Sequence, residues 1–243
     1  RSPSANFADY NSSTRQKRFK RIIKSVDFVI TANKTLAKKG EEFSEKSNIY
    51  IIPSSVNLDG MEPKKSFSLS STPSIGWVGS KITQRYLDLL APKLCELRKH
   101  YEFKLKVISD KEYSYQGLDI ENITWDLDTE KSEIRKFDIG IMPLSSDPFS
   151  EGKASYKLLQ YMAAGIPSVA SSVGMNVEVA DNENGALLAN DCDEFIEKIN
   201  LLLKPESCDL RKSLGEHGRK IIETLYSQKI VGEQFSKMFL ERL

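Results

Sequence analysis

The chain has 243 residues, of which 40% are hydrophobic and 28% are charged, and its formal net charge is +1. These values are typical of a folded globular protein, exclude global disorder, and give no indication of nucleic-acid or membrane binding. No apolar run approaches the roughly 18–20 residues that a membrane-spanning helix needs, and residues 1–11 lack the apolar centre of a signal peptide.

The first part of the chain predicts a small set of alternating helices and strands. The basic stretch 15–24 predicts a helix with a solvated basic face, the alternative being an anion-binding or membrane-surface site. A strand at 26–32, a helix at 34–45 and a strand at 48–53 follow. Residues 54–73 are rich in Pro, Ser and Lys, lack periodicity, and predict a linker.

The rest of the chain repeats this alternation of short apolar segments and amphipathic stretches. We expect strands at 74–79, 103–109, 122–127, 137–144, 167–171 and 185–189. We expect helices at 84–101, 130–136, 153–164, 175–180, 191–203, 207–224 and 227–243. This order predicts an α/β fold with a Rossmann-like, doubly wound parallel sheet, in which ligands bind beyond the carboxyl ends of the strands.

One predicted helix carries two lysines at its N-terminal end, where the backbone is already positive. Lys153 and Lys157 would lie about one turn apart, and Gln160 would continue the same face. A pyrophosphate between the two ammonium groups would turn an unfavourable arrangement into a favourable one. The alternatives are a solvated lysine pair, or a pair neutralised by Glu151 and Asp147.

Three strand-to-helix junctions are expected to share one edge of the sheet, at 79–83, 145–153 and 171–176. Each combines small or hydroxyl side chains with a helix start, which favours phosphate binding. Gly79 would let the backbone approach a ligand closely, and Ser80 adds a hydroxyl beside Lys81. The chain has neither the dinucleotide-binding glycine spacing nor a P-loop, which argues against nicotinamide, flavin and P-loop enzymes.

The cysteines and histidines indicate no metal site or nucleophilic triad. Cys95, Cys192 and Cys208 are odd in number and fit no metal-ligand spacing, so we interpret them as reduced thiols of a cytoplasmic protein. His100 and His217 are the only histidines, and both stand in polar, helix-like settings. We therefore expect neither a Ser/His/Asp triad nor a histidine-based metal centre.

The motifs together resemble a known family. "DIGIMPL", followed by "EGKASYKLLQYMAAGIPSVASSVGMNVEVADNENGALL", resembles the C-terminal, donor-binding half of a GT-B glycosyltransferase of the retaining family four (glycosyl transferases group 1). "SVDFVITANKTLA" and "NIYIIPSSVN" resemble the segment that leads into that half, and "IGWVGS" resembles its first strand and glycine turn. The resemblance runs in the expected order from about residue 27 to residue 189.

The resemblance implies a nucleotide-sugar donor as substrate, with no cofactor and no required metal. It implies Glu151, which would face the sugar, and Lys157, which would pair with the pyrophosphate, as catalytic residues. The implied nucleotide-sugar-binding residues are Gly79, Ser80, Lys81, Trp125, Lys153, Gln160 and Gly174.

Two positions depart from the family pattern. Gln160 stands where the family often has a second glutamate, and Glu151 lies one position further from it than the family spacing requires. A neutral glutamine can still bind ribose hydroxyls. The alternative for Glu151 is a carboxylate that stabilises a helix start.

The resemblance also implies a domain organisation. Residues 1–58 would be a remnant of the N-terminal, acceptor-side domain with the start of the linker, and residues 59–226 the donor-binding domain. Residues 227–243 would form a helix that crosses back to the N-terminal part. We expect an excised piece of this kind, lacking the rest of its N-terminal domain, to bind donor weakly and to be inactive alone.

The expected function is sugar transfer to a glycan or lipid-linked acceptor in cell-surface polysaccharide or glycolipid synthesis. The expected partners include no nucleic acid. Peripheral association with the inner membrane face and a dimer formed through an exposed edge of the N-terminal strands are further expectations. The alternatives are a sugar-nucleotide epimerase of the same architecture and a non-catalytic nucleotide-sugar-binding or assembly module.

Overall fold

The structure is a computed structural model that describes residues 12–44 and 48–241. The chain forms two compact units, residues 1–53 and residues 54–243. The predictions for residues 1–11, for the end of the helix at 34–45 and for the last two residues of the C-terminal helix lie outside the described residues.

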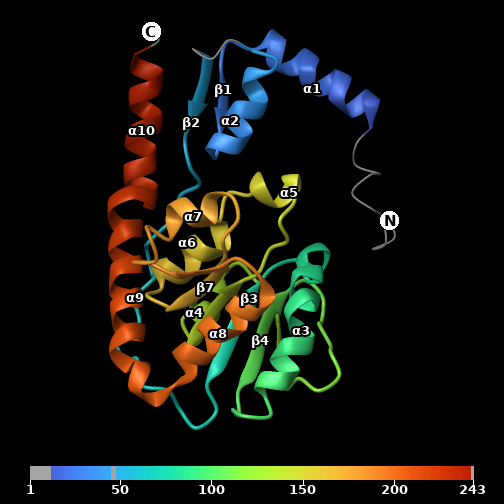
Figure 1. The fold of residues 1–243 in the computed structure, drawn as a ribbon. Coiled ribbons are helices and arrows are strands. Elements are labelled where there is room, and N and C mark those ends of the chain that lie inside the picture. Colours follow the sequence, from blue (N-terminus) through green and yellow to red (C-terminus); the bar gives the residue numbers. More distant parts are fainter. Residues whose placement is uncertain (1–11, 45–47, 242–243) are drawn as a thin grey trace. The chain divides into compact units, whose positions relative to one another are not determined.

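The described residues of the first unit, 12–44 and 48–53, form two helices and two strands, as the periodicity predicts. They are α1 (Ser13–Ser25), β1 (Val29–Thr31), α2 (Lys34–Glu41) and β2 (Ile49–Ile51) (Figure 1). The two strands pair in parallel, with Val29 opposite Ile49. The side chain of Asn33 caps α2 by accepting a hydrogen bond from the Leu36 N–H at 2.9 Å, which fixes where this helix begins.

The second unit is built on one parallel sheet. Its strands are β3 (Ser74–Val78), β4 (Lys104–Ser109), β5 (Ile120–Thr124), β6 (Ile139–Met142), β7 (Ser168–Ser171) and β8 (Leu187–Ala189). They lie in the order β5-β4-β3-β6-β7-β8 with every neighbouring pair parallel. The chain therefore starts in the middle, winds outward in one direction, and returns to wind outward in the other. This confirms the predicted doubly wound fold and puts its switch point between β3 and β6.

Helices cover both faces of this sheet. The helices of the second unit are α3 (Arg85–Leu97), α4 (Glu130–Ile134), α5 (Pro148–Glu151), α6 (Tyr156–Ala163), α7 (Met175–Val179), α8 (Cys192–Leu203), α9 (Cys208–Ile221) and α10 (Gln228–Leu240). Short 3-10 helices, η3 (Lys81–Thr83) and η4 (Pro205–Ser207), and a π-helical turn, η5 (Ile222–Tyr226), lie between them. α3 and α8 pack together against one face, and α6 packs with α9 and η5 against the other (Figure 1). Successive strand residues such as Ile141 and Met142 belong to opposite clusters, as the alternation of side chains along a strand requires. No described helix is both long and apolar enough to cross a bilayer.

The helix that we expected at 153–164 is wrong at its start. α6 begins at Tyr156, because Ser155 before it has a φ of 51°, in the left-handed region that a helix cannot continue through. A buried hydrogen bond of 2.7 Å, which Ser155 Oγ donates to Asn176 Oδ1, accompanies this conformation. Lys153 therefore lies in the loop between α5 and α6, and the expected one-turn spacing from Lys153 to Lys157 is not formed.

Residues 54–73 contain no helix or strand, apart from a parallel bridge between Val56 and Ser227. This agrees with the absence of periodicity, but the segment is firmly attached to the second unit. Three basic side chains hold it: Lys64 bonds Asp138 (2.9 Å), Arg219 donates to the Met61 carbonyl (2.6 Å), and Arg211 donates to the Phe67 carbonyl (2.7 Å).

Candidate functional site

A cavity of about 380 Å³ opens at the carboxyl edge of the sheet. Three strands end there, β3, β4 and β5, and α6 begins beside it. Its lining residues are Val78, Gly79, Ser80, Asp110, Trp125, Glu130, Tyr156, Lys157 and Gln160. This is the edge at which doubly wound sheets bind ligands, and the volume is that of a small-molecule site.

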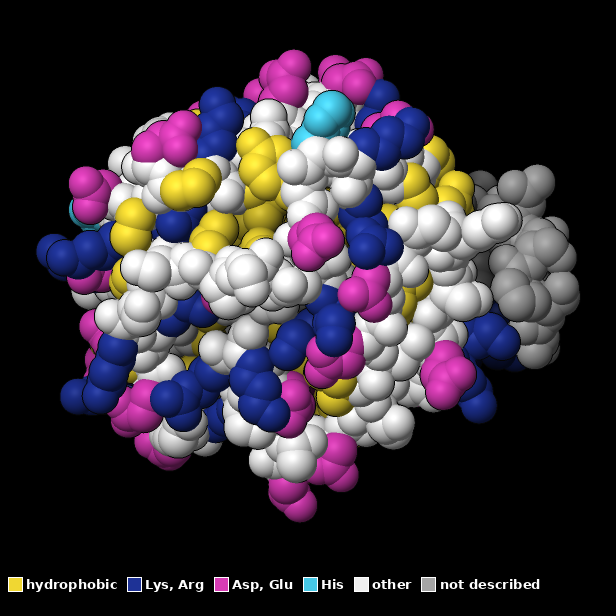
Figure 2. Space-filling model, turned by 90° about the horizontal axis from the view of Figure 1, so that it is seen from below, with side chains coloured by type: hydrophobic (Ala, Val, Ile, Leu, Met, Phe, Trp, Pro, Cys, Tyr) yellow, Lys and Arg dark blue, Asp and Glu magenta, His cyan; other side chains and the backbone are white. Residues whose placement is uncertain are grey.

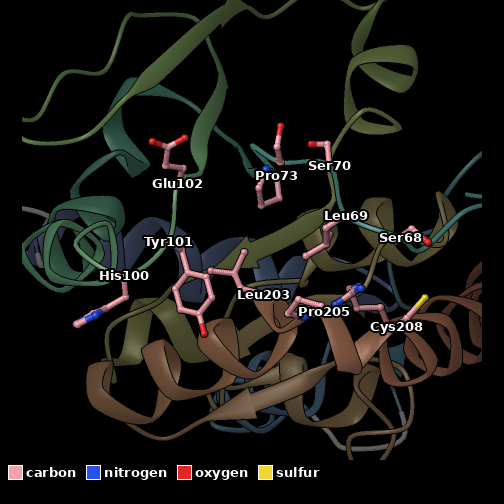
Figure 3. A pocket seen from close by; sticks show the side chains of 12 residues that line it. Ser68, Leu69, Ser70, Pro73, His100, Tyr101, Glu102, Leu203, Pro205 and Cys208 are labelled. Atoms are coloured by element: carbon pink, nitrogen blue, oxygen red, sulfur yellow. The ribbon is translucent and has the colours of Figure 1, made fainter.

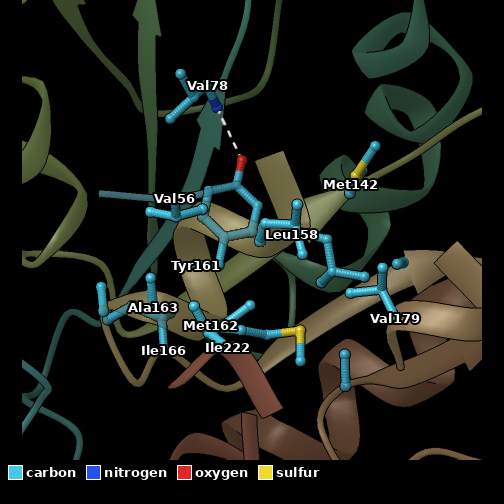
Figure 4. Close-up of a cluster of buried hydrophobic side chains, with 14 of the residues drawn as sticks. Val56, Val78, Met142, Leu158, Tyr161, Met162, Ala163, Ile166, Val179 and Ile222 are labelled. Carbon is cyan, nitrogen blue, oxygen red and sulfur yellow. Dashed lines mark hydrogen bonds between the residues drawn. The ribbon is translucent and has the colours of Figure 1, made fainter. Parts of the chain in front are cut away.

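A buried tyrosine fixes the main chain that leads into this cavity. The β3–β6 ladder ends at the pair Gly76–Gly140, and beyond it Tyr161 bridges the two strands. Its hydroxyl accepts a hydrogen bond from the Val78 N–H at 3.0 Å (Figure 4) and donates to the Ile141 carbonyl at 3.3 Å. The two strands are therefore held at a set separation immediately before the glycine turn.

The turn after β3 requires glycine. A Cβ on Gly79 would lie 2.4 Å from the Trp77 ring and 2.7 Å from Thr83 Oγ1, too close for any real contact. The absence of a side chain leaves the backbone of Gly79 and Ser80 accessible from the cavity. The close approach of a ligand to this backbone stays a prediction.

Lys157 supplies the positive charge of the cavity. It lies in the first turn of α6, and its Nζ is 5.7 Å from the centroid of the Trp77 ring. Burial, and next the charge of Lys153, lower the pKa of Lys157 from its ordinary 10.5 to about 8. No ion pair involves Lys157 within residues 12–44 and 48–241. A largely desolvated ammonium group without a carboxylate partner is a strong attractor for an anion.

Lys153 reaches the neighbourhood of Lys157 by a different route from the one expected. Its Nζ lies 4.5 Å from the centroid of the Phe149 ring and 5.3 Å from that of Tyr86, two cation–π distances. It does not line the cavity. Its charge still acts on Lys157, so the loop between α5 and α6 brings the two ammonium groups near each other without a shared helix face.

The junctions after β6 and β7 touch each other. Gly174 has a φ of 55°, and a Cβ on it would lie 2.7 Å from the Glu151 carbonyl oxygen.

Lys81 lines a neighbouring hollow, and its backbone N–H donates to Asp110 Oδ1 at 2.7 Å.

The structure thus separates the nine predicted site residues into two groups. Five line the cavity: Gly79, Ser80, Trp125, Lys157 and Gln160. Four lie outside its lining: Lys81, Glu151, Lys153 and Gly174.

Four lining residues were not predicted as site residues from the sequence: Val78, Asp110, Glu130 and Tyr156. Asp110 follows β4, and Glu130 begins the helix after β5. Trp125 Nε1 donates to Glu130 Oε1 at 2.8 Å, so these two side chains are held together. All strands of a parallel sheet end at the same edge, so the segments after β4 and β5 were candidates too, but Trp125 is the one residue predicted there.

A second cavity, of about 550 Å³, lies at the opposite edge of the sheet. Figure 3 shows its walls: Pro73 precedes β3, Glu102 precedes β4, and Leu203 ends α8. Lysine and arginine side chains alternate with acidic ones on the face seen in Figure 2, so no single sign of charge marks this face. Although larger, this cavity stands at the amino ends of the strands, and the cavity around Lys157 is the candidate site.

The fold and the cavity define the class of protein: a Rossmann-like domain with the architecture of GT-B glycosyltransferase structures. The sequence profile of the family described as "Glycosyl transferases group 1" matches residues 72–205, more than half of the chain. The chain belongs to the glycosyl transferases group 1 family.

Solved structures show the same fold at low sequence identity. The sucrose-phosphate synthase of Thermosynechococcus elongatus matches with a TM-score of 0.78 and 17% identity, over 98% of this chain and 63% of that one. HepE of Anabaena, in complex with UDP-glucose, matches with a TM-score of 0.78 and 12% identity, over 97% of this chain and 70% of that one. The C-terminal domain of a group 1 family protein of Francisella tularensis matches with a TM-score of 0.55 and 16% identity, over 71% of this chain and 99% of that one.

The present chain spans 63% of the length of the sucrose-phosphate synthase and 66% of that of a glycosyltransferase of Rickettsia africae. A search of curated proteins finds none that matches.

Proposed function

We propose that this chain is the donor-binding part of a retaining glycosyltransferase of family four. It would bind a nucleotide sugar for transfer to a glycan or lipid-linked acceptor in cell-surface polysaccharide or glycolipid synthesis. The observation that carries the proposal is Lys157, a desolvated ammonium group in a cavity of nucleotide size, beside the glycine turn at Gly79. Membership of the family and the UDP-glucose bound to HepE on a similar fold support it.

Each residue of the site has a proposed role. The backbone at Gly79 and the hydroxyl of Ser80 approach the diphosphate, and Lys157 pairs with it. As the bond to the sugar breaks, negative charge grows on the diphosphate, and a fixed ammonium group stabilises this charge more than that of the intact donor. The proposal assigns this stabilisation to Lys157 and to the N-terminal end of α6, without a required metal.

The predicted site residues that lie outside the cavity lining also have proposed roles. Glu151, at the end of α5 and against Gly174, would face the donor sugar where it leaves the cavity. Lys153, next along the loop, would strengthen the positive potential at the diphosphate. Lys81 and Gln160 would contact the nucleoside, Gln160 through the ribose hydroxyls.

The remainder of the activity is proposed to need the N-terminal domain, because the chain spans only part of the length of its structural neighbours. Residues 1–58 would be the remnant of that domain, and the chain alone would bind donor without turnover. Association with the inner membrane face is proposed for α1, which carries six basic residues and no acidic one. Dimerisation is proposed through the edges of β1 and β2.

Two measurements test the proposal. Calorimetry on the chain with GDP, UDP, dTDP and ADP should show binding of at least one of them. An acceptor-dependent transfer assay with the protein joined to its N-terminal domain should give a glycosidic product with retained anomeric configuration. An epimerised donor would indicate the epimerase instead, binding without any reaction would indicate an assembly module, and no binding would refute the donor site.

A further inference from the structure

The lining of the cavity at the carboxyl edge carries charges of both signs. It holds the ammonium group of Lys157 and the carboxylates of Asp110 and Glu130. The charge of Glu130 raises the pKa of Tyr156, which also lines the cavity. If the diphosphate binds at Lys157, as proposed above, the nucleoside extends toward the carboxylates.

Aromatic side chains close to Glu130 offer a place for a base. Trp125 is 45% exposed and Tyr156 is 47% exposed, and both line the cavity. Exposed aromatic faces of this kind stack on nucleobases, and such stacking is tolerant of base identity. Stacking therefore positions a base without selecting its identity. The selectivity depends on the polar groups beside the base.

Glu130 is held in position to make that choice. Its Oε1 accepts the hydrogen bond from Trp125 Nε1 at 2.8 Å, which fixes the carboxylate beside the indole ring. Within the described part of the chain, Oε2 has no hydrogen-bond donor. A carboxylate has only acceptor sites, so whatever part of a ligand it meets must present N–H or O–H groups.

The bases differ in what they present to a carboxylate. The outer edge of guanine carries two adjacent donors, N1–H and the N2 amino group, which together match one carboxylate. Uracil presents one N–H between two carbonyl oxygens, and both oxygens would be repelled. Adenine and cytosine each present an amino group next to a ring nitrogen that is itself an acceptor.

We propose that Glu130 selects guanine, and that the donor of this protein is a GDP-sugar. The inference rests on the proposed donor-binding function and goes beyond it by naming the base. A well-placed bidentate contact discriminates between bases by roughly ten- to a hundredfold. GDP should therefore bind at least about tenfold more tightly than UDP.

A competing role for Glu130 is to bind the ribose hydroxyls, in the place of the glutamate that Gln160 replaces. Ribose is common to all four nucleotides, so the loss of such a contact would weaken all of them equally. The ratio of GDP to UDP affinity therefore separates the two roles.

The experiment is calorimetry on this chain with GDP, UDP, ADP and CDP, for the wild type, Glu130→Gln and Glu133→Gln. Glu133 is the matched control: it lies on the same helix, bonds Lys136 at 2.6 Å, and does not line the cavity. We expect the wild type to prefer GDP, Glu130→Gln to lose about tenfold in GDP affinity while UDP affinity holds or improves, and Glu133→Gln to match the wild type.

Three results would overturn the inference. If the wild type binds UDP, ADP or CDP as tightly as GDP, the inference is overturned. This comparison holds even if the variant fails to fold. A loss of the same size for all nucleotides in Glu130→Gln would assign the residue to the ribose. If no nucleoside diphosphate binds the wild type, the proposed function fails together with the inference, whereas tight UDP binding removes only the inference.

Discussion

Replacing Lys157 by methionine should change stability and binding in opposite directions. Methionine retains most of the length and apolar contact of the lysine stem and removes the charge. In the folded chain the pKa of Lys157 is about 8 against an ordinary 10.5, which corresponds to about 3 kcal/mol of unfavourable free energy for the protonated form. The variant should therefore raise the free energy of unfolding at pH 7 by about 1–3 kcal/mol.

The sign follows from proton counting. Between pH 8 and pH 10.5 the unfolded chain keeps the proton of Lys157 and the folded chain releases it, so the pKa difference makes stability rise with pH in this window. The unfavourable contribution is fully present below pH 8 and absent above about pH 10.5. Urea unfolding of the wild type and the variant should therefore differ most at pH 7 and converge near pH 10.

The affinity for nucleotides should decrease in the same variant. A charge-assisted contact to phosphate contributes about 1.5–3 kcal/mol, so the affinity of Lys157→Met for a nucleoside diphosphate should fall at least about tenfold. Lys153→Met is the matched control, because its ammonium group stands over Phe149 and Tyr86 outside the cavity, and it should lose less affinity. A Lys157→Met variant that is less stable than the wild type at pH 7, or that binds as tightly, would refute this reasoning.

Three further outcomes are expected. Diphosphate affinity measured by calorimetry should decline as pH rises above about 8, because Lys157 loses its charge there, and a flat profile to pH 9.5 would contradict this. Tyr161→Phe should lower the free energy of unfolding by about 1–3 kcal/mol, since the buried Val78 N–H loses its acceptor; urea denaturation measures this, and an unchanged midpoint would mean that another acceptor replaces the hydroxyl. Gly79→Ala should abolish measurable nucleotide binding, because its Cβ meets the Trp77 ring at 2.4 Å and the turn must shift; wild-type affinity in this variant would show that the turn does not contact the ligand.

The sheet could be predicted from the sequence because its signals are local. All residues of β3 and β6 are buried, and strands buried on both faces give continuous apolar runs. The start of α6 could not be predicted from periodicity, because it is set by the left-handed conformation of Ser155, whose side chain bonds Asn176, twenty-one residues away. Apolar periodicity predicts a helix over the whole length of the pattern, and here the helix begins later than the pattern does.

The same distinction between local and distant signals applies to the candidate site. Gly79 and Lys157 could be predicted because each stands at a strand-to-helix junction with suitable chemistry. Lys153 stands at such a junction too, but the rings of Phe149 and Tyr86, the latter from α3, draw its ammonium group away from the cavity. Glu130 was missed because an acidic residue at a helix start is ordinary, and only the fold shows that Trp125 holds it at the cavity.

The attachment of residues 54–73 decides how the sheet unit can be prepared as a separate fragment. The Val56 N–H donates to the Tyr226 carbonyl at 2.9 Å, and the Val56 carbonyl accepts from the Gln228 N–H at 3.0 Å. A recombinant fragment that begins after Leu58 would discard both bonds and leave two backbone groups of the last turns unsatisfied. A fragment that begins at Ser54 keeps both bonds, and it should be the more stable and more protease-resistant protein.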